Sequence, residues 1–205
     1  MTTKDRTTKD RTTKRTIKDS LDSRSFNQPL LAQEQQLLND LQLPESYANT
    51  VNQVVVPLCE RLTEVYRLQQ GPLVLGINGP QGSGKSTLAA FVQARLRAEQ
   101  DLSVVVISLD DLYLGRQQRQ QLARDIHPLL QTRGVPGTHD IDLGVDTVQQ
   151  LLQAGPEHIT AIPRFDKATD DRCPPCEWEQ HKGPVDIILL EGWCLGARPQ
   201  PAAAL

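Results

Sequence analysis

The sequence contains few aromatic residues, no excess of basic charge and no long apolar segment. Phe, Trp and Tyr make up 4% of the 205 residues, which is too few to build the platforms on which nucleic-acid bases stack. The formal net charge is −3, so we expect no nucleic acid as a main partner. No apolar run approaches the roughly 18 residues that cross a bilayer, and we expect no membrane partner either.

Cysteine is also scarce. The four cysteines are too few for a disulfide scaffold at this length, and no signal peptide is recognisable, so we expect reduced thiols and a cytoplasmic protein. Cys173 and Cys176 form a C-x-x-C with His181 and Cys194 farther along, which leaves a zinc site or a redox pair open. A second C-x-x-C is absent, however, and an exposed loop is the expectation. Cys59 and Cys194 are predicted to be small packing residues.

The amino-terminal segment differs in composition from the rest of the chain. Residues 1–20 contain seven basic and three acidic side chains in repeats of TTKDR, and Ile17 is their only large apolar residue after Met1. Such a segment cannot bury enough apolar surface to fold. We predict a disordered basic tail over residues 1–24, in which the interspersed aspartates argue against a transit peptide or a nucleic-acid-binding arm.

The region after the tail changes from helical to mixed patterning. Leucines and valines recur at spacings of three and four over residues 27–70, with Pro44 between them, which predicts two helices. Gly71 and Pro72 end this region, and short apolar strands then alternate with helical segments. This order is typical of an α/β fold with a parallel sheet flanked by helices, and we expect its nucleotide-binding core over residues 73–196.

The most specific motif lies between a predicted strand and a predicted helix. LVLGIN (73–78) has the pattern of a buried strand, and residues 86–100 that of a helix. The loop between them fits the P-loop pattern G-x-x-x-x-G-K-[ST], whose backbone N–H groups and helix N-terminus bind phosphate. The sequence therefore predicts ATP binding at Gly79, Pro80, Gln81, Gly82, Ser83, Gly84, Lys85, Ser86 and Thr87.

Two loop side chains and one acidic residue complete the expected nucleotide site. Lys85 is expected to act in catalysis beside the β and γ phosphates, and the Ser86 hydroxyl to ligate Mg²⁺. VDIILLEG (185–192) is a second apolar strand, with Asp186 at its start and Glu191 at its end. Ligands of parallel sheets bind beyond the carboxyl ends of the strands, and Asp186 lies about 16 Å from that edge. Glu191 is therefore the predicted metal ligand.

A third strand brings two more carboxylates to the same edge. SVVVIS (103–108) is followed closely by Asp110 and Asp111. One of these could accept the proton of a substrate hydroxyl. Successive side chains of an extended segment alternate between faces, so only one of the two can face the acceptor. Both are equally compatible with capping the next helix.

Four further segments carry a resemblance to a known family: SLDDLY (108–113), HPLLQTRGVPGTHD (127–140), IPRFDKATDDR (162–172) and ILLEGWCLG (188–196). Behind GPQGSGKS, they resemble D-glycerate 3-kinase of the plant and cyanobacterial type, which is similar to uridine kinase, pantothenate kinase and phosphoribulokinase. The resemblance implies a P-loop kinase domain over residues 25–205. It also implies an ATP-dependent and Mg²⁺-dependent kinase whose small-molecule acceptor is D-glycerate and whose product is 3-phosphoglycerate.

The resemblance assigns individual residues as well. It places the base that accepts the hydroxyl proton at Asp110 and puts Asp111 beside it, toward Mg²⁺. The segments around Arg133, His139 and Arg164 resemble the acceptor site, and these side chains suit the carboxylate and hydroxyls of a small sugar acid. Arg133 or Arg164 could equally be an ion-pair residue that fixes its own loop.

The chain departs from this family at its end. Relatives continue well beyond the EGW segment, whereas this chain has nine residues after Gly196. We therefore expect a truncated chain that lacks the adenine pocket and the lid. The alternatives are a nucleotide-binding remnant without transfer activity and a kinase for uridine or pantothenate. The oligomeric state is left open.

Overall fold

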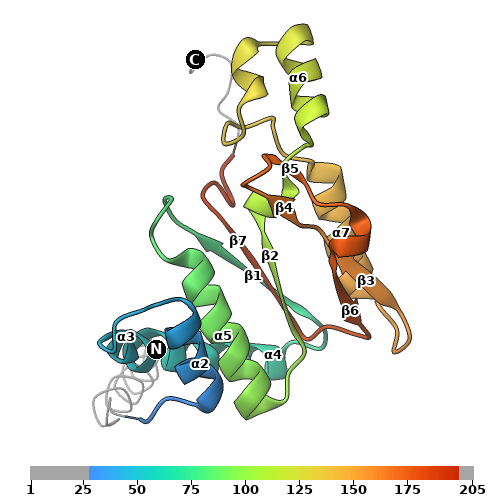
Figure 1. Cartoon of the computed structure of the whole chain (residues 1–205). Coiled ribbons are helices and arrows are strands. Elements are labelled where there is room, and N and C mark those ends of the chain that lie inside the picture. Colours follow the sequence, from blue (N-terminus) through green and yellow to red (C-terminus); the bar gives the residue numbers. More distant parts are fainter. Residues whose placement is uncertain (1–27, 199–205) are drawn as a thin grey trace, which may run out of the picture.

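A three-stranded parallel sheet forms the centre of the protein (Figure 1). The computed structural model describes residues 28–198, so the predicted tail over residues 1–24 lies outside the described residues. β1 (Leu73–Asn78) and β2 (Val104–Ser108) both pair in parallel with β7 (Ile187–Gly192), which lies between them. This arrangement confirms the predicted α/β fold.

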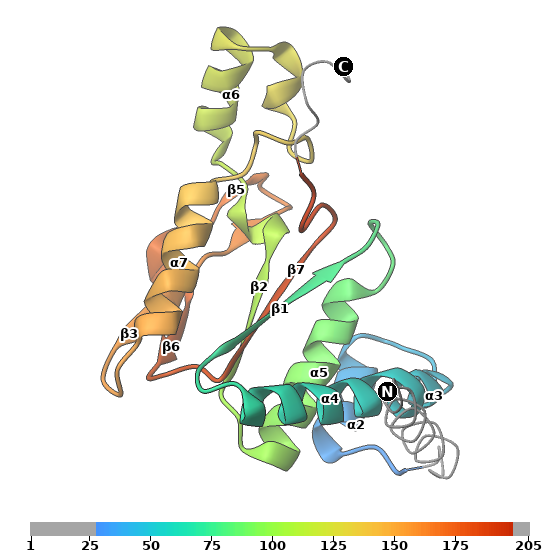
Figure 2. The same cartoon turned by 180° about the vertical axis from the view of Figure 1, so that it is seen from behind.

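The helices of the first half of the chain gather beside one face of the sheet (Figures 1 and 2). α2 (Ala32–Asp40) comes first, and the predicted interruption at Pro44 follows it. Helical backbone then runs without a break through α3 (Tyr47–Thr50), the π-helical turn η1 (Val51–Val55) and α4 (Val56–Leu68). Pro57 near the start of α4 has no N–H to donate to the preceding turn, which explains a π-helical turn at this place.

Alternate residues of β7 face two different cores. Ile187 and Leu189 pack with the helices α2 to α5, where α5 (Lys85–Gln100) lies directly against the sheet. Ile188 and Leu190 point to the opposite face and join a second apolar cluster. Because both faces of the strand are covered, its sequence is a continuous apolar run, as is typical of parallel sheets.

The second core contains elements from the later half of the chain. It is covered by α7 (Ile141–Gln153) and by β3 (Ile159–Ile162), which pairs antiparallel with β6 (Glu179–Lys182). Within residues 28–198, these elements and the helices on the other face enclose the sheet between two layers (Figure 2). No helix of the described part is long and apolar enough to cross a membrane.

Short elements gather at the carboxyl end of the sheet. The 3-10 turn η2 (Leu109–Leu112) follows β2 at once, and the small hairpin β4 (Phe165–Asp166) and β5 (Asp171–Arg172) lies nearby. α6 (Arg116–Asp125) and the 3-10 turn η3 (Pro128–Gln131) pack on each other and project beyond this edge (Figure 1). The 3-10 turn η4 (Pro175–Glu177) lies in the Pro-rich loop.

A buried ion pair fixes α2 to α5. Glu34 is fully buried and the Arg95 side chain is 2% exposed. Arg95 donates from Nε to Oε1 at 2.7 Å and from Nη2 to Oε2 at 2.8 Å, and Nη1 donates to Glu99. A bidentate pair of this kind sets the register of two helices, since neither charge can be left without the other in an apolar core.

Candidate active site

The loop from β1 to α5 has the backbone of a phosphate-binding loop. Gly82 and Gly84 adopt left-handed conformations, with φ of 76° and 84°. A Cβ at Gly79 would lie 2.9 Å from the Ser83 Oγ. The left-handed backbone at Gly82 and Gly84 therefore favours glycine there, and the loop ends where α5 begins with Lys85. The open end of a sixteen-residue helix presents unpaired N–H groups, and these suit a phosphate.

Lys85 leaves the first turn of α5 and returns over the loop. Its Nζ donates to the Pro80 carbonyl at 3.0 Å. Within residues 28–198, no carboxylate lies within ion-pair distance of this ammonium group. An ammonium that makes one neutral hydrogen bond can exchange it for a stronger bond to a phosphate oxygen.

Glu191 occupies the centre of the sheet edge. It pairs in register with Ile77 of β1 and Ser108 of β2, because β7 lies between these strands. Its side chain is 4% exposed, and Oε1 accepts from the Ser86 Oγ at 2.8 Å and from the Ser108 Oγ at 2.7 Å. A hydroxyl and a carboxylate oxygen are hard ligands, so Ser86 and Glu191 fit a Mg²⁺ ion that takes its remaining ligands from phosphates and water.

Asp186 lies at the far end of the same strand, as predicted. Its carboxylate accepts from the Ser103 backbone N–H at 2.7 Å and from the Tyr66 hydroxyl. These bonds join the strand entry to α4, away from the carboxyl edge.

Asp110 and Asp111 point to different places. Asp110 lines a cavity of about 560 Å³ together with Lys85 and Ser86. Asp111 is not among the residues that line it, because its two oxygens accept from the Arg164 Nη1 at 3.0 Å and from the Phe165 N–H at 3.1 Å. The expected divergence of the two side chains is present, although the backbone here is a 3-10 turn and not an extended segment.

The three predicted acceptor residues are not brought together. Arg133 lines the cavity, whereas Arg164 is held by Asp111 and by Glu179 at 3.1 Å. His139 is 9% exposed and stacks on the Tyr113 ring with centroids 4.3 Å apart. Burial lowers the pKa of His139, against the opposing effect of the Asp110 charge. His139 and Arg164 are not among the residues that line the cavity, so the fold brings only Arg133 of the three to it.

The cavity also contains residues to which sequence reasoning gave no role. Lys167 donates from Nζ to the Asp110 Oδ2 at 2.7 Å. Burial raises the pKa of Tyr113 to about 12, helped by the charge of Asp110 and a hydrogen bond to it. Lys167 was visible only as part of the PRFDK segment, and its distance from Asp110 along the chain gives no local signal. The lining comprises Pro80, Gln81, Gly82, Lys85, Ser86, Asp110, Tyr113, Arg133, Gly134, Lys167, Glu191, Gly192 and Trp193.

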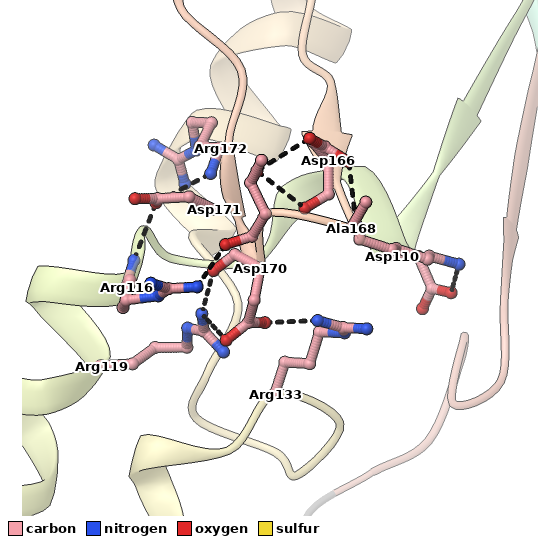
Figure 3. A network of polar contacts seen from close by, with 11 residues as sticks. Asp110, Arg116, Arg119, Arg133, Asp166, Ala168, Asp170, Asp171 and Arg172 are labelled. Carbon is pink, nitrogen blue, oxygen red and sulfur yellow. Dashed lines mark hydrogen bonds and ion pairs between the residues drawn. The ribbon is translucent and has the colours of Figure 1, made fainter.

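Asp170 joins the cavity wall to the projecting helix α6 (Figure 3). Its carboxylate pairs with Arg133 and, at 3.0 Å, with the buried Arg119. The hydrogen bond from Arg119, followed by that from Arg133, lowers the pKa of Asp170. Asp170 has a φ of 56°, a conformation that few non-glycine residues adopt, and these two contacts hold it there.

The zinc hypothesis is wrong for the part of the chain that the structure describes. No group of three or more His, Cys, Asp and Glu side chains there is placed to hold a metal ion. All four cysteines are free, and Cys176 is exposed. Cys59 is buried in the first core, where burial raises its pKa to about 12, and Cys194 packs against the second core. Both therefore pack as the sequence predicted.

Proteins of similar sequence include kinases. No family model matches the chain. The chain is 36% identical over 138 residues to the chloroplastic D-glycerate 3-kinase of Arabidopsis thaliana. The matched region covers 64% of this chain and 30% of that protein. It is 36% identical over 141 residues to an uncharacterised kinase of Schizosaccharomyces pombe, covering 65% of this chain and 50% of that one.

A solved structure extends the likeness to the fold. The D-glycerate 3-kinase of Cryptococcus neoformans superimposes with a TM-score of 0.63 at 27% identity, covering 73% of this chain and 55% of that one. In sequence and fold the chain is therefore similar to P-loop kinases of the glycerate kinase and uridine kinase group. The chain spans half or less of the length of the two curated relatives named above.

Proposed function

We propose that this P-loop kinase domain transfers the γ-phosphoryl group of ATP to a hydroxyl of a small acid, D-glycerate, to give 3-phosphoglycerate. The observation that carries the proposal is the meeting of four groups in one cavity: Lys85, Ser86, Asp110 and Glu191. They come from three strand ends that are far apart in the sequence, and together they would provide a phosphate-binding loop, a pair of metal ligands and a carboxylate that lines the same cavity.

Each group has a step that its position allows. The P-loop N–H groups and Lys85 bind the phosphates, and Ser86 and Glu191 would hold Mg²⁺. When bound, Mg²⁺ supplies neutralisation of the charge that develops on the phosphate oxygens. Asp110 accepts the proton of the acceptor hydroxyl while the hydroxyl oxygen bonds to the γ phosphorus, the bond to the bridging oxygen breaks and ADP leaves.

Asp111 has a different place in the proposal from the one that the family resemblance gave it. Both of its oxygens are occupied by the Arg164 guanidinium and the Phe165 N–H. We therefore assign Asp111 to holding the loop that follows β3, and Arg164 with it. Arg133 keeps its proposed place in the acceptor site because it lines the cavity.

A coupled assay of ADP formation tests the proposal on the full chain with Mg²⁺ and ATP. The acceptors are D-glycerate, L-glycerate, glycerol, uridine and pantothenate, each with a control without acceptor. We expect turnover above the control with D-glycerate. Turnover with uridine or pantothenate alone would reassign the acceptor. Nucleotide binding without turnover on any acceptor would instead show a nucleotide-binding protein that performs no transfer.

A further inference from the structure

The charged side chains of the cavity differ in how firmly their contacts hold them. Glu191 is buried and accepts from two serine hydroxyls, and Lys85 belongs to the P-loop. Two further cations line the cavity, namely Arg133 and Lys167. Arg133 already pairs with Asp170, and its guanidinium lies 5.7 Å from the centroid of the Phe165 ring.

Lys167 is held far less firmly. Its ion pair with Asp110 is 2.7 Å long, and the two side chains are 58% and 35% exposed. Ion pairs exposed to this extent contribute little to stability, so their partners can separate at small cost. Asp110 is also the group that must be free to accept a proton. The ion pair thus joins the proposed base to an ammonium group that can exchange Asp110 for an incoming anion.

We propose that Lys167 determines specificity for acceptors that carry a carboxylate, by changing its partner from Asp110 to the acceptor. This inference rests on the proposed function. A carboxylate that binds the ammonium group of Lys167 releases the Asp110 Oδ2, which then accepts the hydroxyl proton as the phosphorus–oxygen bond forms. A neutral acceptor leaves the ion pair in place, so Asp110 stays engaged. The same contact therefore governs binding and the availability of the base.

The test compares Lys167→Met, which removes the charge and keeps most of the length, with the wild-type full chain on D-glycerate and on the neutral glycerol. Loss of a charge-assisted contact should raise KM for D-glycerate roughly 10- to 100-fold. Activity on glycerol should rise, since Asp110 is no longer paired. Lys167→Arg should restore part of the preference for D-glycerate, and the affinity for MgATP should change less than about twofold.

Lys182→Met is the matched control. Lys182 also forms a 2.7 Å ion pair with a carboxylate, Glu157, and both side chains are exposed, but it lies on β6 and does not line the cavity. Its loss should leave both acceptors unaffected. Equal losses on D-glycerate and glycerol in Lys167→Met would overturn the inference. A large fall in MgATP affinity would overturn it too, by assigning Lys167 to the phosphates.

A binding measurement separates this inference from the proposed function. D-glycerate is titrated by NMR into the chain with Mg²⁺ and a non-hydrolysable ATP analogue. If the wild type transfers to no acceptor but binds D-glycerate, and Lys167→Met weakens that binding tenfold or more, the inference stands and the proposed function fails. If D-glycerate does not bind, or binds both proteins equally, the inference is overturned.

Discussion

Replacing Asp110 by Asn should slow phosphoryl transfer far more than the same replacement at the neighbouring Asp111. The two residues are adjacent in the sequence and chemically identical, so any difference reports their surroundings. Asp110 lines the cavity with Lys85, whereas Asp111 lies outside its lining and bonds to Arg164. Asn keeps the size of Asp and removes its ability to accept a proton.

The expected loss for Asp110→Asn follows from general-base catalysis. A positioned base contributes about 10² to 10⁴ in rate, so kcat should fall by that factor. Nucleotide affinity should be retained, because the Asp110 side chain contacts Lys167 and Tyr113 and not the P-loop backbone.

The expected loss for Asp111→Asn is structural and small. One amide oxygen can still accept from the Phe165 N–H, so the change removes mainly the bond from Arg164. That arginine is 43% exposed, and solvent screening reduces the loss to about 1 kcal/mol or less. For a domain of this size, that corresponds to a Tm lower by about 2 to 4 °C. A change in kcat of a few-fold at most should accompany it.

The assay measures kcat for both variants at saturating Mg²⁺ and ATP, with Tm as the check on folding. A near-normal kcat for Asp110→Asn, together with a large fall for Asp111→Asn, would refute the assignment of the base. It would show that the loop rearranges so that Asp111 enters the cavity.

Three further outcomes follow from single contacts. Lys85→Ala should weaken ATP binding steeply, at least tenfold by titration calorimetry, and parent-like affinity would disprove the P-loop interpretation. Glu34→Gln should lower the free energy of unfolding, measured in urea, by about 3 kcal/mol, because the buried Arg95 loses its counter-charge. The double variant Glu34→Leu with Arg95→Met should recover most of that stability. A loss below about 1 kcal/mol for Glu34→Gln would contradict the role of the ion pair. The pKa of Asp170 is lowered from its usual value of 3.8, so the ionised carboxylate stabilises the fold at pH values above 3.8. The stability difference between wild type and Asp170→Asn should therefore be constant near neutral pH and vanish as acid protonates the carboxyl, and a pH-independent difference in thermal melts would contradict the pairing with Arg119.

The sequence by itself determined the parts of this protein that depend on local order. LVLGIN, the glycine loop and the following helix are contiguous, so their succession alone predicts a phosphate-binding loop at a strand end. The rule that ligands lie beyond the carboxyl ends of parallel strands was enough to select Glu191 over Asp186. The apolar run that contains Ile187 to Leu190 likewise predicted a strand.

Only the tertiary structure decided which side chains meet in the cavity. Lys167 and Asp110 are 57 positions apart, and no local pattern in either segment indicates their contact. Arg164 had the chemistry of a carboxylate ligand, yet the fold places it against Asp111. A charged side chain binds whichever opposite charge the packing of distant segments brings near, so its partner is a property of the whole fold and not of its neighbours in the chain.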